Sequence, residues 1–442
     1  MKRIKSDKIL LTDGLFEGYV YFESDKILDV TKEELPVTEE YDATGYYVSP
    51  GFIDMHTHGG GGNPFEGSVD EIVAGCNFHL THGTTTICPT ISAAVFESMA
   101  RSVENVEIAM TDPRIKSTVL GAHLEGPYLS KEQAGAQCPN FITAPREEEY
   151  LPLLKDHGNA IARWSYAPEN DKDEKFAKAL KKHNVVASAG HTNAIYDDMR
   201  RAAENGCHLV THLYSCTSTI TRDHGFRRLG VIESAYLMDD MYVEIICDGK
   251  HLPPELIKLI YKIKGSDRIA LVTDSLALAG TDQTHGWMQS TEFIIEDGVC
   301  KLMDRSAFAG SIATADRLVR VAVKEADIPV AEAVRMITQV PARIMGLSQK
   351  GSIAQGLDAD FVIFDENINV KQVFAKGALI RMLHIKKSLR GLSFSATFYF
   401  FGWSDRRGIL MDLHTACHAV SLRSHTFPSK GPQKYQSREA GR

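Results

Sequence analysis

Eight short runs, mostly of β-branched or aliphatic residues and each ending in polar residues, most constrain how this chain can fold. Most are separated by stretches with apolar residues near the 3.6-residue period of a helix, most clearly at 173–183, 196–206 and 253–263. The runs occupy residues 46–58, 84–90, 117–127, 161–169, 184–193, 207–215, 241–251 and 268–275. Strands alternating with helices, repeated eight times, predict an α/β fold of the TIM-like (β/α)8 barrel type.

The predicted barrel spans residues 51–344, roughly 290 residues, against the ~250 typical of the fold. The flanking segments 1–50 and 345–380 contain short alternating strands without a helical period. Neither segment is long enough to bury a core alone. We therefore expect the two flanks to combine into one small β-sandwich domain.

The segment 381–442 differs in composition from the rest of the chain. It holds 11 Lys and Arg against 3 Asp and Glu, a local charge of +8, so the first 380 residues carry −16. Its aromatic residues follow no clear helix or strand period. A basic interaction tail is one interpretation; we favour a poorly ordered extension or the product of a displaced reading frame.

The overall charge and the apolar segments exclude several classes of protein. The net charge of −8 argues against a nucleic-acid partner for the chain as a whole. No stretch approaches the roughly 18–20 apolar residues of a membrane span, and the start, MKRIKSDKILL, lacks the apolar core of a signal peptide. The eight cysteines include no C-x-x-C pair. We expect a cytoplasmic protein with neither a membrane nor a nucleic-acid partner.

The first run delivers two histidines and then four glycines, in the sequence FIDMHTHGGGG at residues 52–62. Residues two apart on a strand point to the same side, so His56 and His58 would lie side by side. The glycines allow a sharp turn and a close backbone approach to metal or substrate. An isolated pair of this kind is usually an ordinary hydrogen-bonded pair, so a ligand role depends on partners elsewhere.

Such partners follow other runs. In a barrel the carboxyl ends of the strands meet at one mouth, which is where catalytic groups gather. The further candidates at strand ends are Glu125, His191, His212, His251 and Asp274. Nitrogen and oxygen ligands of this kind suit Zn, Fe, Mn, Ni or Co. Their convergence favours a divalent metal site over a set of unrelated structural residues.

The candidates are sufficient for two metal ions. Glu125 can bridge both, with the H-x-H pair holding one ion and His191 and His212 the other, at the ~3.5–4 Å separation of two-metal sites. Asp274, which we also count among the candidate ligands, is placed to take a proton from water and return it to a leaving group. This arrangement is typical of a hydrolase.

The motifs around these residues resemble those of the N-acetylglucosamine-6-phosphate deacetylases of the amidohydrolase superfamily, over about residues 1–380. The motifs are, in order, PGFIDMHTHG, TTTICPT, HLEGPYLS, KEQAGAQ, GHTNA, THLYS, DGKH, LVTDS, FAGS and KGSIAQGLDADFVIFD. The resemblance implies a barrel of the metal-dependent hydrolase type acting as a homodimer. It also implies hydrolysis of the acetamido group of N-acetylglucosamine 6-phosphate, giving glucosamine 6-phosphate and acetate in amino-sugar catabolism.

The resemblance also implies roles for individual residues. Glu125, His191 and His212 match the ligands found throughout the family. His56 and His58 resemble the extra pair of its two-metal members, and Asp274 matches the catalytic acid/base.

Further positions match substrate-binding residues of the family. They are Ala136, Gln137, Ser215, Cys216, Arg227, His251 and Phe308. Some members have His in place of Gln137, and Asn-Ala often stands where this chain has Ser215-Cys216. Arg227 matches an arginine that binds the phosphate and can reach the partner subunit's site in a dimer, although a surface arginine in a basic cluster is the alternative.

Three other functions remain open. One is deacetylation of a related N-acetylhexosamine phosphate such as N-acetylgalactosamine 6-phosphate. Another is hydrolysis of a cyclic amide, although hydrolases of that kind often bridge their metals with a modified lysine, a role that Glu125 fills here. A non-catalytic barrel would be expected to lack ligands, and none is missing. Serine-nucleophile chemistry finds no G-x-S-x-G motif.

Overall fold

A computed structural model of the chain describes residues 1–382. The predicted tail therefore lies outside the described residues from position 383 onward. Within the described part, each of the eight runs contributes to one parallel barrel. Its strands are β6 (Phe52–Thr57), β9 (Thr84–Ser92), β11 (Ala122–Glu125), β12 (Ile161–Tyr166), β13 (Val186–Ala189), β14 (Leu209–Val210), β17 (Tyr242–Ile246) and β18 (Ile269–Val272).

The ring closes between its last and first strands. The backbone N–H of Asp274 donates to His56 O over 2.9 Å, and that of His58 donates to Ser275 O over 2.8 Å. A further short strand, β10 (Thr118–Val119), pairs with β9. The closure brings the end of the eighth run directly beside the H-x-H pair of the first.

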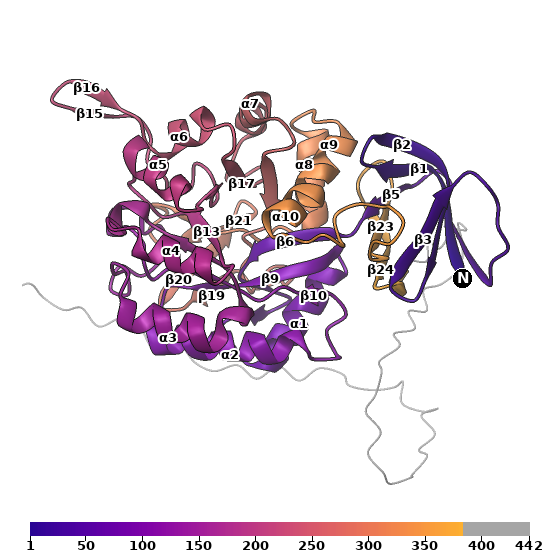
Figure 1. The fold of residues 1–442 in the computed structure, drawn as a ribbon, viewed down its shortest axis with the longest axis horizontal. Helices are drawn as coiled ribbons and strands as arrows, with labels where there is room; N and C mark the ends of the chain where they lie inside the picture. The colour runs from indigo at the N-terminus through magenta and orange to yellow at the C-terminus, as the bar shows by residue number, and fades with distance from the viewer. Residues whose placement is uncertain (383–442) are drawn as a thin grey trace, which may run out of the picture. The chain divides into compact units, whose positions relative to one another are not determined.

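A helix follows each barrel strand, and together these helices surround the strands (Figure 1). They are α1 (Val69–Leu80), α2 (Phe96–Met110), α3 (Glu147–His157), α4 (Lys175–Lys182), α5 (Tyr196–Glu204), α6 (Val231–Leu237), α7 (Pro254–Lys264) and α8 (Ala315–Lys324). Two more, α9 (Val330–Ile337) and α10 (Gln339–Ile344), follow in the chain. The (β/α)8 barrel predicted from the sequence is thus confirmed.

Local sequence explains where several of these elements begin and end. Every residue of β9 and β18 is buried, as expected for parallel strands covered on both faces, which are rich in β-branched residues. Ser68 and Glu71 form a capping box at the start of α1. Helix α7 begins at Pro254, where a missing N–H costs nothing, and stops at Gly265, whose φ of +67° favours glycine.

The two flanks of the barrel meet in one eight-stranded sheet. Its strands are β1 (Lys2–Leu11), β2 (Gly14–Glu23), β3 (Lys26–Thr31), β4 (Glu39–Asp42), β5 (Tyr47–Pro50), β23 (Phe361–Phe364), β24 (Val370–Ala375) and β25 (Ala378–Met382). Strand β5 joins the flanks, because Val48 pairs with Ile9 on one side and Ile363 on the other. Phe22, Phe361 and Phe374 belong to the core of this sheet. The first run is therefore divided between this sheet and the barrel.

Three smaller β elements were not expected from the sequence. A four-stranded antiparallel sheet separates β18 from α8, with strands β19 (His285–Met288), β20 (Thr291–Glu296), β21 (Val299–Leu302) and β22 (Phe308–Gly310). A hairpin of β15 (Thr221–Asp223) and β16 (Phe226–Arg228) projects from the barrel at the upper left of Figure 1. Two very short strands, β7 (Gly59–Gly60) and β8 (Asn63–Pro64), form the loop after the H-x-H pair.

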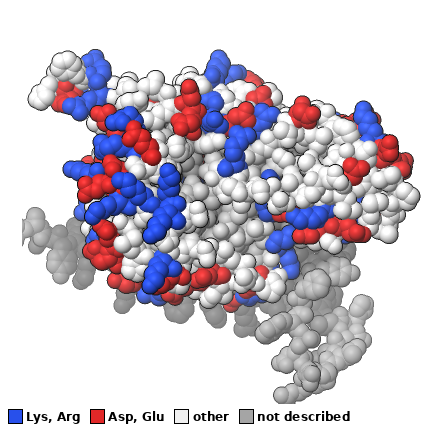
Figure 2. Space-filling view, in the orientation of Figure 1, with Lys and Arg blue, Asp and Glu red and all other residues white. Residues whose placement is uncertain are grey.

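Charged side chains of both signs are interspersed over the face in Figure 2. Among the described residues, no helix combines the length and the apolar character needed to cross a membrane.

Candidate metal centre

The six predicted ligands lie together at the carboxyl ends of the barrel strands and are buried. They are His56, His58, Glu125, His191, His212 and Asp274. His191, His212 and Asp274 have φ values of +46°, +28° and +48°. Positive φ is uncommon outside glycine, and such strained backbone recurs at functional sites.

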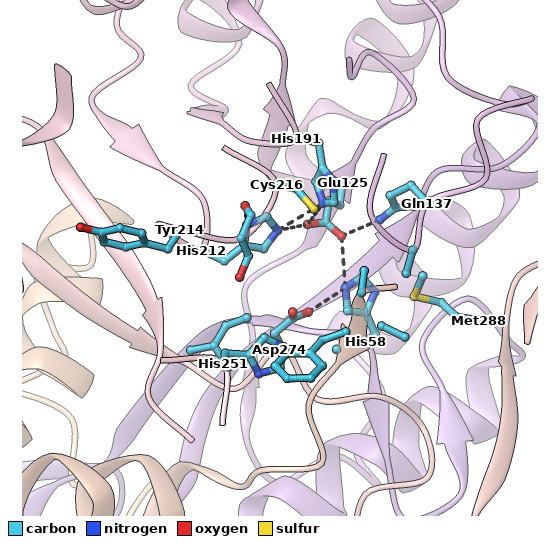
Figure 3. A pocket seen from close by; sticks show the side chains of 17 residues that line it. His58, Glu125, Gln137, His191, His212, Tyr214, Cys216, His251, Asp274 and Met288 are labelled. Atoms are coloured by element: carbon cyan, nitrogen blue, oxygen red, sulfur yellow. Dashed lines mark hydrogen bonds and ion pairs between the residues drawn. The ribbon is translucent and has the colours of Figure 1, made fainter. Parts of the chain in front are cut away.

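The carboxylate of Glu125 lies at the centre of the cluster (Figure 3). Its Oε1 is 2.9 Å from His212 Nε2 and 3.2 Å from His191 Nε2. Oε2 lies 3.2 Å from His58 Nε2, while Oε1 lies 3.4 Å from His56 Nε2. Two groups of three potential ligands therefore share Glu125, and within each group the ligand atoms lie within 4.8 Å of one another.

Asp274 lies beside the first of these two groups. Its Oδ1 is 3.2 Å from His58 Nε2 and 3.4 Å from His56 Nε2. Figure 3 shows its carboxylate facing the same cavity as Glu125. Asp274 therefore lies within the cluster of candidate ligands, beside His56 and His58.

Backbone carbonyls hold the histidines of the second group. His191 Nδ1 lies 2.9 Å from Gln133 O, and His212 Nδ1 lies 3.1 Å from Ser215 O. A carbonyl can only accept, so each Nδ1 carries the proton. Each Nε2 faces Glu125 and is the ring nitrogen left to bind a metal ion.

The histidines of the first group are held by side chains. Ser92 Oγ donates to Glu66 over 2.8 Å, so it accepts from His58 Nδ1, 3.0 Å away. His56 Nδ1 faces Glu244 Oε2 at 3.4 Å. Outer partners of this kind are typical of metal-binding histidines, whose orientation and tautomer they fix.

One buried atom tests whether these residues fit a metal ion. Among the described residues, His56 Nε2 is buried and meets no acceptor in hydrogen-bond geometry, although carboxylate oxygens of Glu125 and Asp274 each lie 3.4 Å away. A buried polar nitrogen without a partner is costly and calls for an explanation. A divalent cation between His56, His58 and Glu125 would satisfy this nitrogen. These three side chains therefore fit a divalent metal ion.

The electrostatics of the centre also favour a cation. Burial opposes ionisation of Glu125, but His56 and His191 outweigh it and hold the pKa of this carboxyl well below its usual range. Burial likewise opposes protonation of His56, but Glu125 and Asp274 prevail and raise its pKa to about 9. The metal-free protein must therefore supply positive charge as imidazolium, which a metal ion would replace.

We expect Zn²⁺ binding to the metal-free protein at pH 7 to release protons. A ligand must be unprotonated to bind, whereas His56, with a pKa of about 9, keeps its proton at pH 7. The apparent affinity should rise as the pH increases through the pKa of about 9 of His56. Calorimetry in two buffers of different ionisation enthalpy counts the protons. His56→Asn should release fewer of them, and equal heats in both buffers for the unaltered protein would contradict the prediction.

The cluster opens into a pocket of about 220 Å³. The six further predicted positions other than Arg227 line this pocket. They are Ala136, Gln137, Ser215, Cys216, His251 and Phe308. The structure therefore brings together these six residues, although Ala136 and Phe308 are about 170 positions apart in the sequence.

Two of these lining residues are already held by protein groups. Gln137 Nε2 donates to Glu125 Oε2 over 2.8 Å, and its Oε1 accepts from the backbone N–H of Ala93 over 2.9 Å. His251 Nδ1 lies 2.9 Å from Asp248 Oδ2, while its ring meets that of Phe308 edge-on, with centroids 5.0 Å apart. Gln137 therefore holds the central carboxylate, and His251 keeps Nε2 for the pocket.

Arg227 lies on the projecting β15–β16 hairpin, where it is exposed and donates to Gly225 O over 3.1 Å. It is not among the described residues that line the pocket. Phe226 beside it is 78 % exposed at the hairpin tip. The structure thus does not bring Arg227 to the site of its own chain.

Several residues of the site were not predicted from the sequence. They are Glu66, Ser92, His123, Arg163, Glu244 and Met288. Arg163 and Glu244 carried a signal, because each is a lone charge within an otherwise mostly apolar strand. Met288 belongs to the unexpected four-stranded sheet and carried none.

Comparisons with known proteins agree with this geometry. The profile of the amidohydrolase family matches residues 47–380. N-acetylglucosamine-6-phosphate deacetylase of Haemophilus influenzae is 32 % identical over 74 % of this chain and 85 % of its own length. N-acetylgalactosamine-6-phosphate deacetylase of a Shewanella species is 29 % identical, over 84 % and 94 %. Among solved structures, an aspartate-to-alanine mutant of the Mycobacterium smegmatis N-acetyl-D-glucosamine-6-phosphate deacetylase, in complex with N-acetyl-D-glucosamine-6-phosphate, gives a TM-score of 0.80. It is 29 % identical and covers 86 % of this chain and 99 % of its own.

Proposed function

The chain belongs to the amidohydrolase family, and from this premise we propose that it hydrolyses N-acetylglucosamine 6-phosphate to glucosamine 6-phosphate and acetate. The observation that carries the proposal is the buried centre around Glu125, with four histidines and Asp274 at the mouth of the barrel. The similarity to the Haemophilus and Mycobacterium deacetylases supports the choice of substrate.

We propose that the centre holds two divalent ions. His56, His58 and Glu125 would hold one, and Glu125, His191 and His212 the other. A divalent ion supplies Lewis acidity, which polarises an amide carbonyl and lowers the pKa of water.

The protein groups around the centre handle the protons and the substrate. His56 and His58 outweigh the effect of burial and lower the pKa of Asp274, so this carboxylate is ionised at neutral pH and can accept a proton from the attacking water. Once the oxygen of water has formed a C–O bond to the acetyl carbon, Asp274 returns that proton to the amide nitrogen as the C–N bond breaks. His251, fixed by Asp248, would contact the substrate through Nε2.

The double variant His56→Asn, His58→Asn should retain one ion per chain where the unaltered protein retains two. This is because the second group of ligands, Glu125 with His191 and His212, is left intact. Elemental analysis after dialysis against the metal provides the count. If the unaltered protein never exceeds one ion at saturating metal, the two-ion proposal is wrong.

We further propose that the enzyme is a cytoplasmic homodimer in which Arg227 binds the phosphate in the partner subunit's site. The exposed Arg227 lies on a hairpin that projects from its own barrel, at the upper left of Figures 1 and 2. An arginine fork suits a phosphate dianion, and binding energy from the distant phosphate can orient the acetamido group.

Arg227→Ala should lower kcat/KM for the phosphorylated sugar by about 10- to 100-fold or more, since charge-assisted hydrogen bonds contribute roughly 1.5–3 kcal/mol. The slow reaction of unphosphorylated N-acetylglucosamine should barely change. Arg222 lies opposite Arg227 in the register of strands β15 and β16, so Arg222→Ala is the matched control. Equal losses on both sugars would mean that Arg227 serves the fold.

Mixing Arg227→Ala chains with Asp274→Asn chains tests whether the arginine crosses the interface. A mixed dimer would carry one site with both defects and one intact site. Activity should then partly recover over that of either variant alone. The absence of recovery, with mixed dimers demonstrated, would place Arg227 in its own chain's site.

Acetate release from a small set of substrates tests the function itself. We expect turnover of N-acetylglucosamine 6-phosphate to exceed that of N-acetylgalactosamine 6-phosphate and of a cyclic amide. The galactosamine substrate is included because a similar relative is named for it. A clear preference for either alternative would overturn the assignment.

A further inference from the structure

A buried ion pair lies within the barrel next to the metal centre, formed by Arg163 of β12 and Glu244 of β17. Both side chains have no exposed surface, and Arg163 Nη1 donates to Glu244 Oε1. Neither residue lines the pocket. Neither, therefore, is placed to contact substrate.

Stability alone does not account for this pair. Removing two charges from water carries a desolvation penalty, and well-packed apolar residues of similar volume are often as stabilising or more so. The surrounding positions show that apolar packing was available, because Val243, Ile245 and Ile246 of the same strand are buried. The ion pair calls for another reason.

The contacts of Glu244 suggest that reason. Its Oε2 faces His56 Nδ1 at 3.4 Å and accepts from the backbone N–H of His212 at 3.4 Å. A second histidine, His123, meets the ring of His56 edge-on, with centroids 4.5 Å apart. His56 is thus held at its nitrogen by Glu244 and at its face by His123.

Arg163 holds Glu244 while joining several strands. Its Nη1 also donates to Met55 O over 3.2 Å, the carbonyl that precedes His56. Its Nη2 donates to Ser188 Oγ over 3.0 Å and Thr211 Oγ1 over 3.3 Å. The guanidinium therefore connects strand β6, which carries His56, with the strands that lead to the other histidine ligands.

We propose that Glu244, held in place by Arg163, is a positioning residue that gives the first ion, bound by His56, His58 and Glu125, its affinity. Glu244 does so by orienting the His56 ring and making the lone pair of Nε2 a stronger ligand for the metal ion. It contacts the second group only through the backbone of His212, so the ion of that group depends on Glu244 much less. This inference rests on the proposed two-ion centre.

The test is a chelator-buffered Zn²⁺ titration of the metal-free full chain that resolves the two dissociation constants. Glu244→Gln should weaken binding of the first ion by about 10- to 100-fold, the usual effect of losing an outer partner, and change the second much less. Stepwise addition of Co²⁺ gives an independent readout, since the visible spectrum reports the geometry of each site. The spectrum of the first site should change and that of the second should not.

Two further variants separate positioning from folding. Glu244→Gln leaves a buried guanidinium unpaired, so the double variant Arg163→Met, Glu244→Gln removes both charges and should show the same selective loss. Asp316→Asn is the matched control, because Asp316 is a mostly buried carboxylate that pairs with Arg320 at 3.0 Å outside the centre. It should lower stability and leave both metal affinities unchanged.

Each outcome decides one proposal. If the unaltered protein binds a single ion, the two-ion centre fails and this inference with it. If it binds two ions and both variants retain both affinities and the Co²⁺ spectra, only the positioning role fails. An equal weakening of both ions, accompanied by a fall in Tm like that of Asp316→Asn, would assign the pair to the fold.

Discussion

Asp274→Asn should lower kcat by about 10⁴-fold or more while the protein remains folded and retains its metal. General acid–base groups contribute typically ~10²–10⁴-fold, and Asp274 would serve both the attack of water and the departure of the amine. Its position supports both roles, since Oδ1 lies 3.2 Å from His58 Nε2 beside the first group of ligands. An amide keeps the shape of the side chain but cannot accept the proton.

The measurements are kcat from acetate release, metal content by elemental analysis, and Tm. Metal content matters because the position of Asp274 also permits a ligand role. Metal loss in parallel with activity would make Asp274 a ligand first and a proton carrier second. A variant with kcat near that of the unaltered protein would remove Asp274 from the mechanism.

Glu125→Gln should abolish tight binding of both ions, and nearly all activity with them. Within the part of the chain that the structure describes, Glu125 is the one residue that both ligand groups share. An amide offers one neutral oxygen where the carboxylate offers two charged ones. Lewis acidity contributes several kcal/mol, and each 1.36 kcal/mol corresponds to tenfold in rate. The expected loss in kcat is therefore about 10³-fold or more.

Elemental analysis and kcat at saturating metal check this prediction. Glu332→Gln is the matched control, because Glu332 is a carboxylate that accepts from Tyr261 on the outer helices, over 2.7 Å. It should retain both ions and full activity. If Glu125→Gln also retains two ions with unaltered affinity, the bridging role of Glu125 is wrong.

The barrel could be predicted because its strands are buried on both faces. Runs such as TTTICPT and RIALVTDS are rich in β-branched and aliphatic residues and lack the 3.6-residue period of the helices between them. The fold then places the end of each run at one mouth, so Glu125 and Asp274 could be assigned to the same site without any knowledge of their distance.

The four-stranded sheet after β18 was missed, although its sequence carried a hairpin signal. Asp297 and Gly298, with φ of +55° and +79°, form the turn between β20 and β21. An Asp-Gly pair between alternating strands is a strong indication of such a turn. The sheet matters for the site because Met288, Phe308 and their neighbours form part of the pocket wall.

The hairpin that carries Arg227 had a similar turn, in which His224 and Gly225 both have positive φ. The function of Arg227 could not be assigned from the sequence, because an arginine that faces solvent and one that faces a second subunit leave the same sequence pattern.

The lone charges of Arg163 and Glu244 are visible in the sequence, but their role as outer partners of the histidines could not be assigned from it. Glu244 and Arg163 approach His56 only because β12 and β17 are both members of a closed barrel, and no periodicity within either strand indicates which residue will face a ligand. The same holds for His123, which lies between Thr90 and Ser165 at 3.0 and 2.8 Å. Sequence patterns located the mouth of the barrel, whereas the support of each ligand required the packed structure.

The most direct test of the whole account is a metal titration of the metal-free protein followed by acetate release from N-acetylglucosamine 6-phosphate. Activity should be negligible without metal, should rise as Zn²⁺, Mn²⁺ or Co²⁺ is added, and should level off at two ions per chain. Full turnover of this substrate by protein shown to contain no metal would contradict the account.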